Sequence, residues 1–256
     1  MTYLSRVQLN PLRRKGQHFL RNPRAVHAAV MGGFPEPPRE GRVLWRLDTR
    51  DRRVDLIVLS PTRPDWTHIV EQAGWPDAEG DQVLVRDYTP ALGHLAVGRE
   101  FAFRLTANPV QSTMTPDKRT KSQQQRHGDN RPSRGFRVAH RTTAHQLDWL
   151  LRRTEKWGFT IPASRTDTAA PGMTPASDAT DPHEVRVVNT VRHTIPKKKD
   201  DSKPTTVTMQ AITFEGRLAV TDPDRLRTAM LDGIGPNKAY GCGLLTLAPL
   251  RGGTGA

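Results

Sequence analysis

GIGPNKAYGCGLLTLAPL, residues 233–250, is the stretch from which the fold of this chain can be worked out. Its loop contains Gly233, Gly235, Gly241 and Gly243. Because glycine adopts positive φ and lets a backbone approach a neighbour closely, we expect sharp turns here, directly before a buried strand over Leu244–Leu250. Such a loop can aim bare N–H groups and the charge of Lys238 at phosphates, although it lacks the P-loop spacing and precedes a strand. The alternative is a tight loop that serves only its own turns.

The residues before this loop predict the rest of a mixed α and β unit. Leu147, Leu150 and Leu151 recur at the spacing of a helix that faces a core, and Gly158 is a suitable stop for that helix. The expected elements are a strand over Phe136–His140, a helix over Thr143–Trp157, strands over Val185–Ile195 and Thr205–Val220, a helix that begins at Asp222-Pro223, and the terminal strand.

The first half of the chain predicts a similar order of elements. Asn22 is a good N-cap and Pro23 fits the first helical position, so a helix is expected to begin there. The expected elements are a strand over Tyr3–Leu9, a basic loop over Pro11–Arg21, a helix from Asn22 to Gly32-Gly33, strands over Val43–Leu47 and Val54–Leu59, a helix over Trp66–Ala73, and a strand over Glu100–Ala107.

Both halves therefore predict the order β-α-β-β-α-β. The expected fold class is α+β, with two tandem ferredoxin-like (RRM-like) domains. Residues 1–111 would form the N-terminal domain. Residues 112–134 have almost no apolar side chains and are interpreted as a mobile basic linker. Residues 135–256 would form the C-terminal domain, with a basic β-hairpin and the glycine-rich loop.

The charge of the chain is unevenly distributed. There are 39 Lys and Arg against 26 Asp and Glu, a net charge of +13. Residues 1–53 carry a net charge of +8, residues 112–145 carry +6 and residues 185–204 carry +4, while the remainder is negative. Such segregation favours a phosphate-binding surface and hence a nucleic-acid partner. The alternative is a generally basic proteome with flexible basic loops.

Several classes of protein are disfavoured by what the sequence lacks. No run of about 18 apolar residues predicts a membrane span, and MTYLSRVQLN at the N-terminus lacks the apolar core of a signal peptide. A lone cysteine, Cys242, fits the reducing cytoplasm and is expected to be structural. The nine histidines form no zinc pattern and no carboxylate pair or nucleophile elbow stands out, so we expect neither metal nor cofactor.

One histidine is a candidate for proton transfer. His27 lies in NPRAVHAAVMGGF, at the edge of an inward stripe formed by Val26 and Val30. An unperturbed imidazole pKa of about 6.5 suits proton transfer near neutral pH. Taken alone, such a histidine is more often an ordinary surface residue. His18 is a rival, but its predicted loop gives it no fixed position.

Three motifs together resemble one known family. They are YLSRV at Tyr3–Val7, HAAVMGGFP at His27–Pro35, and the stretch 233–250. FRLTANP at 103–109 and ITFEGRLAV at 212–220 add to the likeness. The chain resembles the CRISPR repeat-RNA endoribonucleases of type I-E systems, the CasE family.

The resemblance implies both fold and activity. Members have two ferredoxin-like domains and cut repeat RNA at the 3′ side of a short hairpin. They need no metal, leave a 2′,3′-cyclic phosphate, stay bound to the hairpin and join the Cascade complex. The family's catalytic histidine falls on His27. Some members have a tyrosine three residues earlier, where this chain has Arg24, so the division of acid and base roles stays open.

RNA brings its own nucleophile, the 2′-hydroxyl, so the chain must supply alignment, proton transfer and charge stabilisation. His27 is the expected proton-transfer group, and Arg24 or Lys15 the expected cation for the phosphorane. The predicted RNA-binding residues are Arg13, Arg14, Lys15, Arg186, Arg192, Lys197, Lys198, Lys199, Gly233, Gly235, Lys238, Gly241 and Gly243. One alternative is a non-catalytic subunit that binds an RNA hairpin. Another is an unrelated RRM protein, which the lack of RNP aromatics disfavours.

Overall fold

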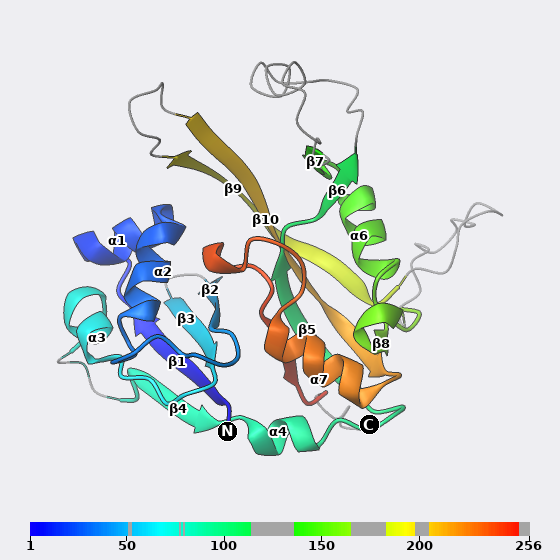
Figure 1. The fold of residues 1–256 in the computed structure, drawn as a ribbon, viewed down its shortest axis with the longest axis horizontal. Coiled ribbons are helices and arrows are strands. Elements are labelled where there is room, and N and C mark those ends of the chain that lie inside the picture. Colours follow the sequence, from blue (N-terminus) through cyan, green and yellow to red (C-terminus); the bar gives the residue numbers. More distant parts are fainter. Residues whose placement is uncertain are drawn as a thin grey trace, which may run out of the picture.

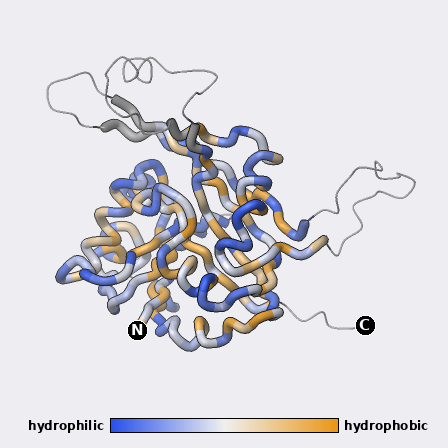
Figure 2. Tube along the Cα trace, turned by 45° about the vertical axis from the view of Figure 1, so that its right-hand side comes forward, coloured by the Kyte–Doolittle hydropathy of each residue, from blue (hydrophilic) through white to orange (hydrophobic). Residues whose placement is uncertain are grey.

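The computed structural model describes residues 1–50, 53–76, 78, 80–113, 136–164, 183–197 and 205–250. Two antiparallel β-sheets lie side by side, each accompanied by helices, with the first half of the chain on the left of Figure 1 and the second half on the right. Hydrophobic and hydrophilic stretches are interspersed along the coloured trace (Figure 2). Among the described residues, no helix has both the length and the apolar character that crossing a membrane requires.

The first sheet has the strand order β2-β3-β1-β4 and is antiparallel throughout. Its elements are β1 (Tyr3–Leu9), α1 (Arg14–Arg21), α2 (Pro23–Met31), β2 (Leu44–Arg50), β3 (Arg53–Ser60), α3 (Thr67–Ala73) and β4 (Val83–Asp87). Val7 and Leu56 of the strands share one buried apolar cluster with Phe19, Val26 and Ile69 of the helices. This unit is ferredoxin-like, as predicted.

Two expectations for the first half were wrong. Its fourth strand is β4, not the predicted strand over Glu100–Ala107. The expected basic loop over Pro11–Arg21 contains helix α1, in which only Gly16 and Phe19 are buried. A helix with so few apolar positions gives little periodicity to read from sequence, and β4 is a five-residue strand without a buried residue.

The second sheet has the order β11-β5-β10, and β10 also pairs with β9 and β8. Its elements are β5 (Glu100–Ala107), α6 (Thr143–Leu151), the 3-10 turn η1 (Glu155–Trp157), β8 (Phe159–Thr160), β9 (Val185–Lys197), β10 (Thr205–Val220), α7 (Pro223–Asp232), the 3-10 turn η2 (Lys238–Tyr240) and β11 (Leu245–Ala248). Phe103, Leu105 and Phe214 of the sheet pack with Leu150 and Leu226 of the helices. The order β5-α6-β9-β10-α7-β11 is the second ferredoxin-like unit.

The first strand of this unit is β5, not the predicted strand over Phe136–His140. That segment forms β7 (Phe136–Ala139), which pairs with β6 (Val110–Thr113) in a separate two-stranded sheet. A short helix, α4 (Thr89–Gly93), leads from β4 to β5. We therefore propose a domain boundary between α4 and β5, in place of the expected one at residue 111. Most of the expected linker lies outside the described residues.

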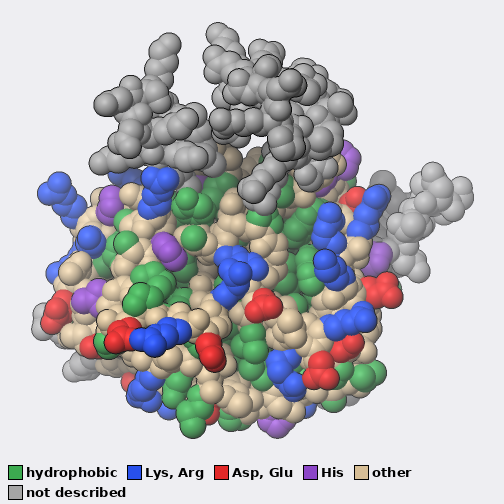
Figure 3. Space-filling model, in the orientation of Figure 1, with side chains coloured by type: hydrophobic (Ala, Val, Ile, Leu, Met, Phe, Trp, Pro, Cys, Tyr) green, Lys and Arg blue, Asp and Glu red, His purple; other side chains and the backbone are tan. Residues whose placement is uncertain are grey.

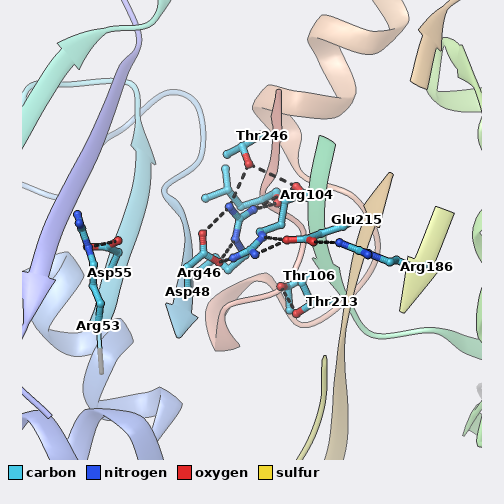
Figure 4. A network of polar contacts seen from close by, with 11 residues as sticks. Arg46, Asp48, Arg53, Asp55, Arg104, Thr106, Arg186, Thr213, Glu215 and Thr246 are labelled. Carbon is cyan, nitrogen blue, oxygen red and sulfur yellow. Dashed lines mark hydrogen bonds and ion pairs between the residues drawn. The ribbon is translucent and has the colours of Figure 1, made fainter. Parts of the chain in front are cut away.

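A buried arginine on β2 ties the two domains together (Figure 4). The side chain of Arg46 is only 3% exposed, and its Nε and Nη2 donate to the carboxylate of Asp48 at 2.7 and 2.9 Å. Its Nη1 donates to the carbonyl of Leu244 at 2.9 Å, and Nη2 also donates to the hydroxyl of Thr246 at 3.0 Å. Arg104 of β5 reaches the same Asp48 at 3.1 Å. The first sheet is thereby fixed to two strands of the second.

The network continues through the second sheet. Arg104 also pairs with Glu215 of β10, whose other oxygen lies 3.5 Å from Arg186 of β9. Burial by itself raises the pKa of Asp48, but the hydrogen bonds and charges of Arg46 and Arg104 outweigh it and hold that pKa below its ordinary value. Asp48 is thus ionised, as expected of a carboxylate that contacts two arginines.

Candidate functional site

Helix α2 positions the candidate catalytic histidine. The side chain of Asn22 accepts from the N–H groups of Arg24 and Ala25 at 3.1 and 3.4 Å, which confirms the predicted N-cap. Val26 and Val30 are fully buried in the first core. His27 lies at the edge of this stripe and is half-buried, while Arg24, one turn earlier, is exposed. Since residues three apart share a helix face, Arg24 and His27 are neighbours.

His27 lines a pocket of about 260 Å³ to which both domains contribute. Helix α2 supplies His27 and Met31, the segment before β2 supplies Arg42, and η2 of the glycine-rich loop supplies Lys238. The other lining residues are Pro38, Gly41, Val43 and Ala239. The structure therefore brings together two residues that are 211 positions apart in the chain, one from each candidate motif.

The environment of His27 favours the neutral imidazole. Burial lowers its pKa below the ordinary value of 6.5, because desolvation disfavours the charged form. Its Nδ1 is buried and has no hydrogen-bond partner. Proton exchange with a substrate therefore falls to Nε2. A histidine that is neutral near pH 7 is suited to accept a proton.

The glycines of the loop face protein. A Cβ added to Gly233 would lie 2.8 Å from Leu44, and one added to Gly241 would lie 2.7 Å from the ring of Trp45. All four glycines have positive φ, between 79° and 98°. The glycines let the loop turn and approach β2 closely.

The expectation of bare N–H groups aimed at phosphates is wrong for three of these glycines. The N–H of Gly233 donates to Ala229, that of Gly241 to Lys238 and that of Gly243 to Thr106, in each case to the carbonyl oxygen. An N–H group that is bonded within the protein is not available to a phosphate. From this loop Gly235 and Lys238 stay proposed RNA contacts.

The three basic residues before His27 are presented by helix α1 and the residue that precedes it. Arg14 and Lys15 are exposed, and Arg13 donates to the carbonyl of Gly74 at 3.3 Å. Lys15 Nζ lies 5.5 Å from the centroid of the Phe19 ring. All three basic residues line a hollow with His18. In Figure 3, Lys, Arg and His side chains gather at the upper left, where Figure 1 places α1 and α2. We call Arg13, Arg14 and Lys15 the α1 basic cluster.

The basic hairpin residues lie apart from the His27 pocket. Arg186 and Arg192 are exposed on β9. Lys197 is the last residue of β9, and Lys198 and Lys199 lie outside the described residues. None of these residues lines the His27 pocket. Of the predicted hairpin contacts, the structure thus describes two exposed arginines on β9, away from the His27 pocket.

Arg42 was not among the residues predicted from sequence. It follows Gly41 in the segment before β2, where no motif marks it, and it reaches His27 only through the fold. Its charge also affects Lys238: burial, and then Arg42, lower the pKa of Lys238, while Asp232 acts in the opposite direction. The pocket therefore holds two cations beside the histidine.

Other chemistries find little support in the described part of the chain. Within it, no three His, Cys, Asp or Glu residues group together as metal ligands. Burial raises the pKa of Cys242 to about 12, so its thiol stays protonated and is a poor nucleophile, as expected of a structural cysteine.

Comparisons with known proteins extend over nearly the whole chain. The model of the family described as CRISPR associated protein matches residues 2–249. The CRISPR-associated endoribonuclease Cse3 of Thermus thermophilus is 28% identical over 96% of this chain and 100% of its own length. The CRISPR system Cascade subunit CasE of Escherichia coli is 27% identical over 80% of this chain and 94% of its own. A structure of CRISPR endoribonuclease Cse3 bound to 19 nt RNA has a TM-score of 0.69 and 30% identity, covering 96% of this chain and 100% of its own.

Proposed function

The chain belongs to the family of CRISPR-associated proteins that includes the Cse3 and CasE endoribonucleases, and from this premise we propose its function. It is an endoribonuclease that binds the hairpin of CRISPR repeat RNA and cleaves the precursor at the 3′ base of that hairpin. It stays bound to the product as a subunit of Cascade. The observation that carries the proposal is His27, half-buried in a pocket that it shares with Lys238 and Arg42.

The chemistry needs only groups that the RNA and the pocket supply. The 2′-oxygen attacks the adjacent phosphorus, the bond from phosphorus to the 5′-oxygen breaks, and a 2′,3′-cyclic phosphate and a 5′-hydroxyl result. His27 takes the proton of the 2′-hydroxyl as general base, because its lowered pKa keeps it neutral. Arg24, on the same helix face, holds RNA phosphates at the entrance, and the reaction requires neither metal nor cofactor.

The proposed function also implies the partners of the protein and the compartment in which it works. The precursor RNA is a transcript, and the lone thiol of Cys242 is typical of a reducing compartment, so we propose that the protein works in the cytoplasm. There it would bind the repeat hairpin first and then the other subunits of Cascade. No step of this scheme involves a membrane.

The experiment that tests the function is single-turnover cleavage of the cognate repeat hairpin in EDTA. The proposal expects cleavage at one position, a 2′,3′-cyclic phosphate on the upstream product, and no cleavage when the scissile nucleotide carries a 2′-deoxyribose. Tight binding of the hairpin without cleavage would overturn the enzyme assignment in favour of a non-catalytic hairpin-binding subunit. Cleavage that EDTA abolishes would overturn the metal-independent mechanism.

The rate of cleavage is expected to rise with pH and then level off. If His27 is the base, only its neutral form reacts, so the rate at subsaturating RNA follows deprotonation of the unbound enzyme. Because burial lowers the pKa, the midpoint should fall below 6.5. The measurement is the second-order cleavage rate between about pH 5 and pH 8, within the range where histidine titrates. A rate that declines with rising pH over this range would instead assign His27 the role of acid.

The α1 basic cluster is expected to set affinity and not the rate of the chemical step. Replacing both Arg14 and Lys15 with Gln should weaken hairpin binding and lower the slope of log affinity against log salt by about 1.5, since each lost phosphate contact contributes about 0.7–0.9. Cleavage at saturating protein should stay unchanged. Arg152→Gln with Lys156→Gln, an exposed pair of the second domain, is the matched control. An unchanged salt slope in the Arg14 and Lys15 variant would remove this cluster from the RNA interface.

A further inference from the structure

The side chain of Lys238 is held in place by glycines. A Cβ on Gly233 would lie 3.2 Å from Lys238 Cε, and a Cβ on Gly243 would lie 3.3 Å from Lys238 Cγ. Both distances are shorter than ordinary van der Waals contact, so any larger residue would press on the lysine stem. The stem therefore lies close against two backbone segments, which restricts the positions that the ammonium group can take in the pocket.

The backbone around Lys238 is held in a conformation that side chains rarely adopt. Asn237 has φ of 65°, and among the described residues it is the one non-glycine with positive φ. Gly241, at the other end of the turn, has φ of 80°. Hydrogen bonds from the N–H of Tyr240 to Asn237 O and from the N–H of Gly241 to Lys238 O close the turn. Strained positions of this kind cluster at functional sites, where they fix a group in advance.

Two cations share this pocket with a histidine. Lys238 and Arg42 both line it; Lys238 is half-buried, and Arg42 is exposed at the edge of the pocket. Bringing like charges together and partly desolvating one of them costs free energy, which a bound anion would offset. A phosphodiester is the anion that the proposed substrate provides. The arrangement is that of a phosphate site prepared before the substrate arrives.

Arg24 and Lys15, the cations expected from sequence to stabilise the phosphorane, lie outside the His27 pocket. Arg24 is exposed, and Lys15 is exposed over the ring of Phe19. Neither residue lines the His27 pocket, whereas Lys238 does. An exposed cation outside the pocket interacts with a phosphate at His27 through water-screened charge, and its effect on a transition state there is correspondingly small.

We propose that Lys238 is a catalytic residue, whose ammonium contacts a nonbridging oxygen of the scissile phosphate beside His27, with Arg42 as the second cation of this phosphate site. The inference rests on the proposed function. As the 2′-oxygen bonds to phosphorus and the 2′-proton passes to His27, negative charge grows on the nonbridging oxygens, and Lys238 stabilises it. The glycines of the loop serve catalysis indirectly, by making room for the lysine stem.

The test compares Lys238→Gln with the wild type and with Lys156→Gln, an exposed lysine on η1. Removing one preorganised charge contact from a transition state lowers the rate by about 10²–10³-fold. We expect that loss in the single-turnover rate at saturating protein, with affinity for a 2′-deoxy hairpin changed by less than about tenfold, or ~1.4 kcal/mol. Lys238→Arg should recover part of the rate, and Lys156→Gln should behave as the wild type.

Phosphorothioate substrates test whether Lys238 contacts the scissile phosphate, because a purely structural lysine would not affect the discrimination between their diastereomers. Sulfur in place of the nonbridging oxygen that Lys238 contacts should slow the wild type for one diastereomer, and Lys238→Gln should lose that discrimination. Cleavage by Lys238→Gln at the wild-type rate, or unchanged discrimination between diastereomers, would overturn the role of Lys238 and leave the endoribonuclease assignment intact. Absence of cleavage by the wild type would overturn both. Thermal unfolding of each variant shows whether a loss of rate is due to misfolding. If Lys238→Gln is misfolded, the rate of Lys238→Arg tests the role of Lys238 in its place.

Discussion

Replacing His27 with alanine is expected to abolish cleavage of the repeat hairpin while leaving hairpin binding intact. A positioned general base contributes about 10²–10⁴-fold to a rate, and the single-turnover rate should fall by that factor. His27 is half-buried at the rim of the first core, beside Val26 and Val30, so its removal leaves the helix stripe intact. The measurement is single-turnover cleavage in EDTA at protein concentrations that saturate the RNA, with affinity measured separately on a 2′-deoxy hairpin.

His94→Ala is the matched control for this experiment, because His94 is an exposed histidine at the end of α4, far along the chain from the pocket. Added imidazole should restore part of the rate to His27→Ala and none to variants that fail for other reasons. Equal rates for the wild type and His27→Ala would place the proton-transfer group elsewhere. An equal loss in His94→Ala would show that the assay reports folding and not chemistry.

Replacing Arg46 with methionine is expected to be the most destabilising single change discussed for this chain. The variant removes the bidentate partner of Asp48, whose side chain is only 14% exposed, and leaves it Arg104; it also removes the donors to Leu244 and Thr246 across the domain junction. Breaking a buried ion pair from one side costs about 3–5 kcal/mol. In a chain of this size that corresponds to a fall in the midpoint of thermal unfolding of about 6–20 °C. The measurement is thermal unfolding followed by circular dichroism.

Arg53→Met is a control with the same spacing between the arginine and its carboxylate in the sequence. Arg53 pairs with Asp55 two residues on, as Arg46 pairs with Asp48 (Figure 4). The Arg53 side chain, however, is 46% exposed. Exposed ion pairs contribute about 0–1 kcal/mol, so Arg53→Met should leave the unfolding midpoint nearly unchanged. If the two variants unfold at the same temperature, the Arg46 network does not hold the domains together.

The features that could be predicted from sequence depend on neighbouring residues. Asn22 and Pro23 predict the start of α2, because the capping hydrogen bonds join residues that are adjacent in the sequence. Asp222 and Pro223 do the same for α7. The border position of His27 follows from the 3.6-residue period. These local signals gave the elements and the candidate histidine, whose catalytic role stays a prediction.

The features that could not be predicted depend on distant residues. Alternation in Glu100–Ala107 shows that a strand exists, but its partners, β10 and β11, are chosen by the packing of both halves, so the strand was given to the wrong sheet. Arg42 has no motif and shares a pocket with His27 only through the fold of the first domain, while Lys238 joins them from the second domain. The glycines of the loop predict a turn. The residues that they approach, Leu44 and Trp45, depend on the tertiary structure and could not be predicted.

A pocket that is built from both ends of the chain has a consequence during synthesis. His27 is synthesised 211 residues before Lys238, and β11 follows Lys238. On the proposed roles, a nascent chain that has only its first domain carries the base without Lys238. Its catalytic centre becomes complete only after the glycine-rich loop has been made and β11 has paired with β5.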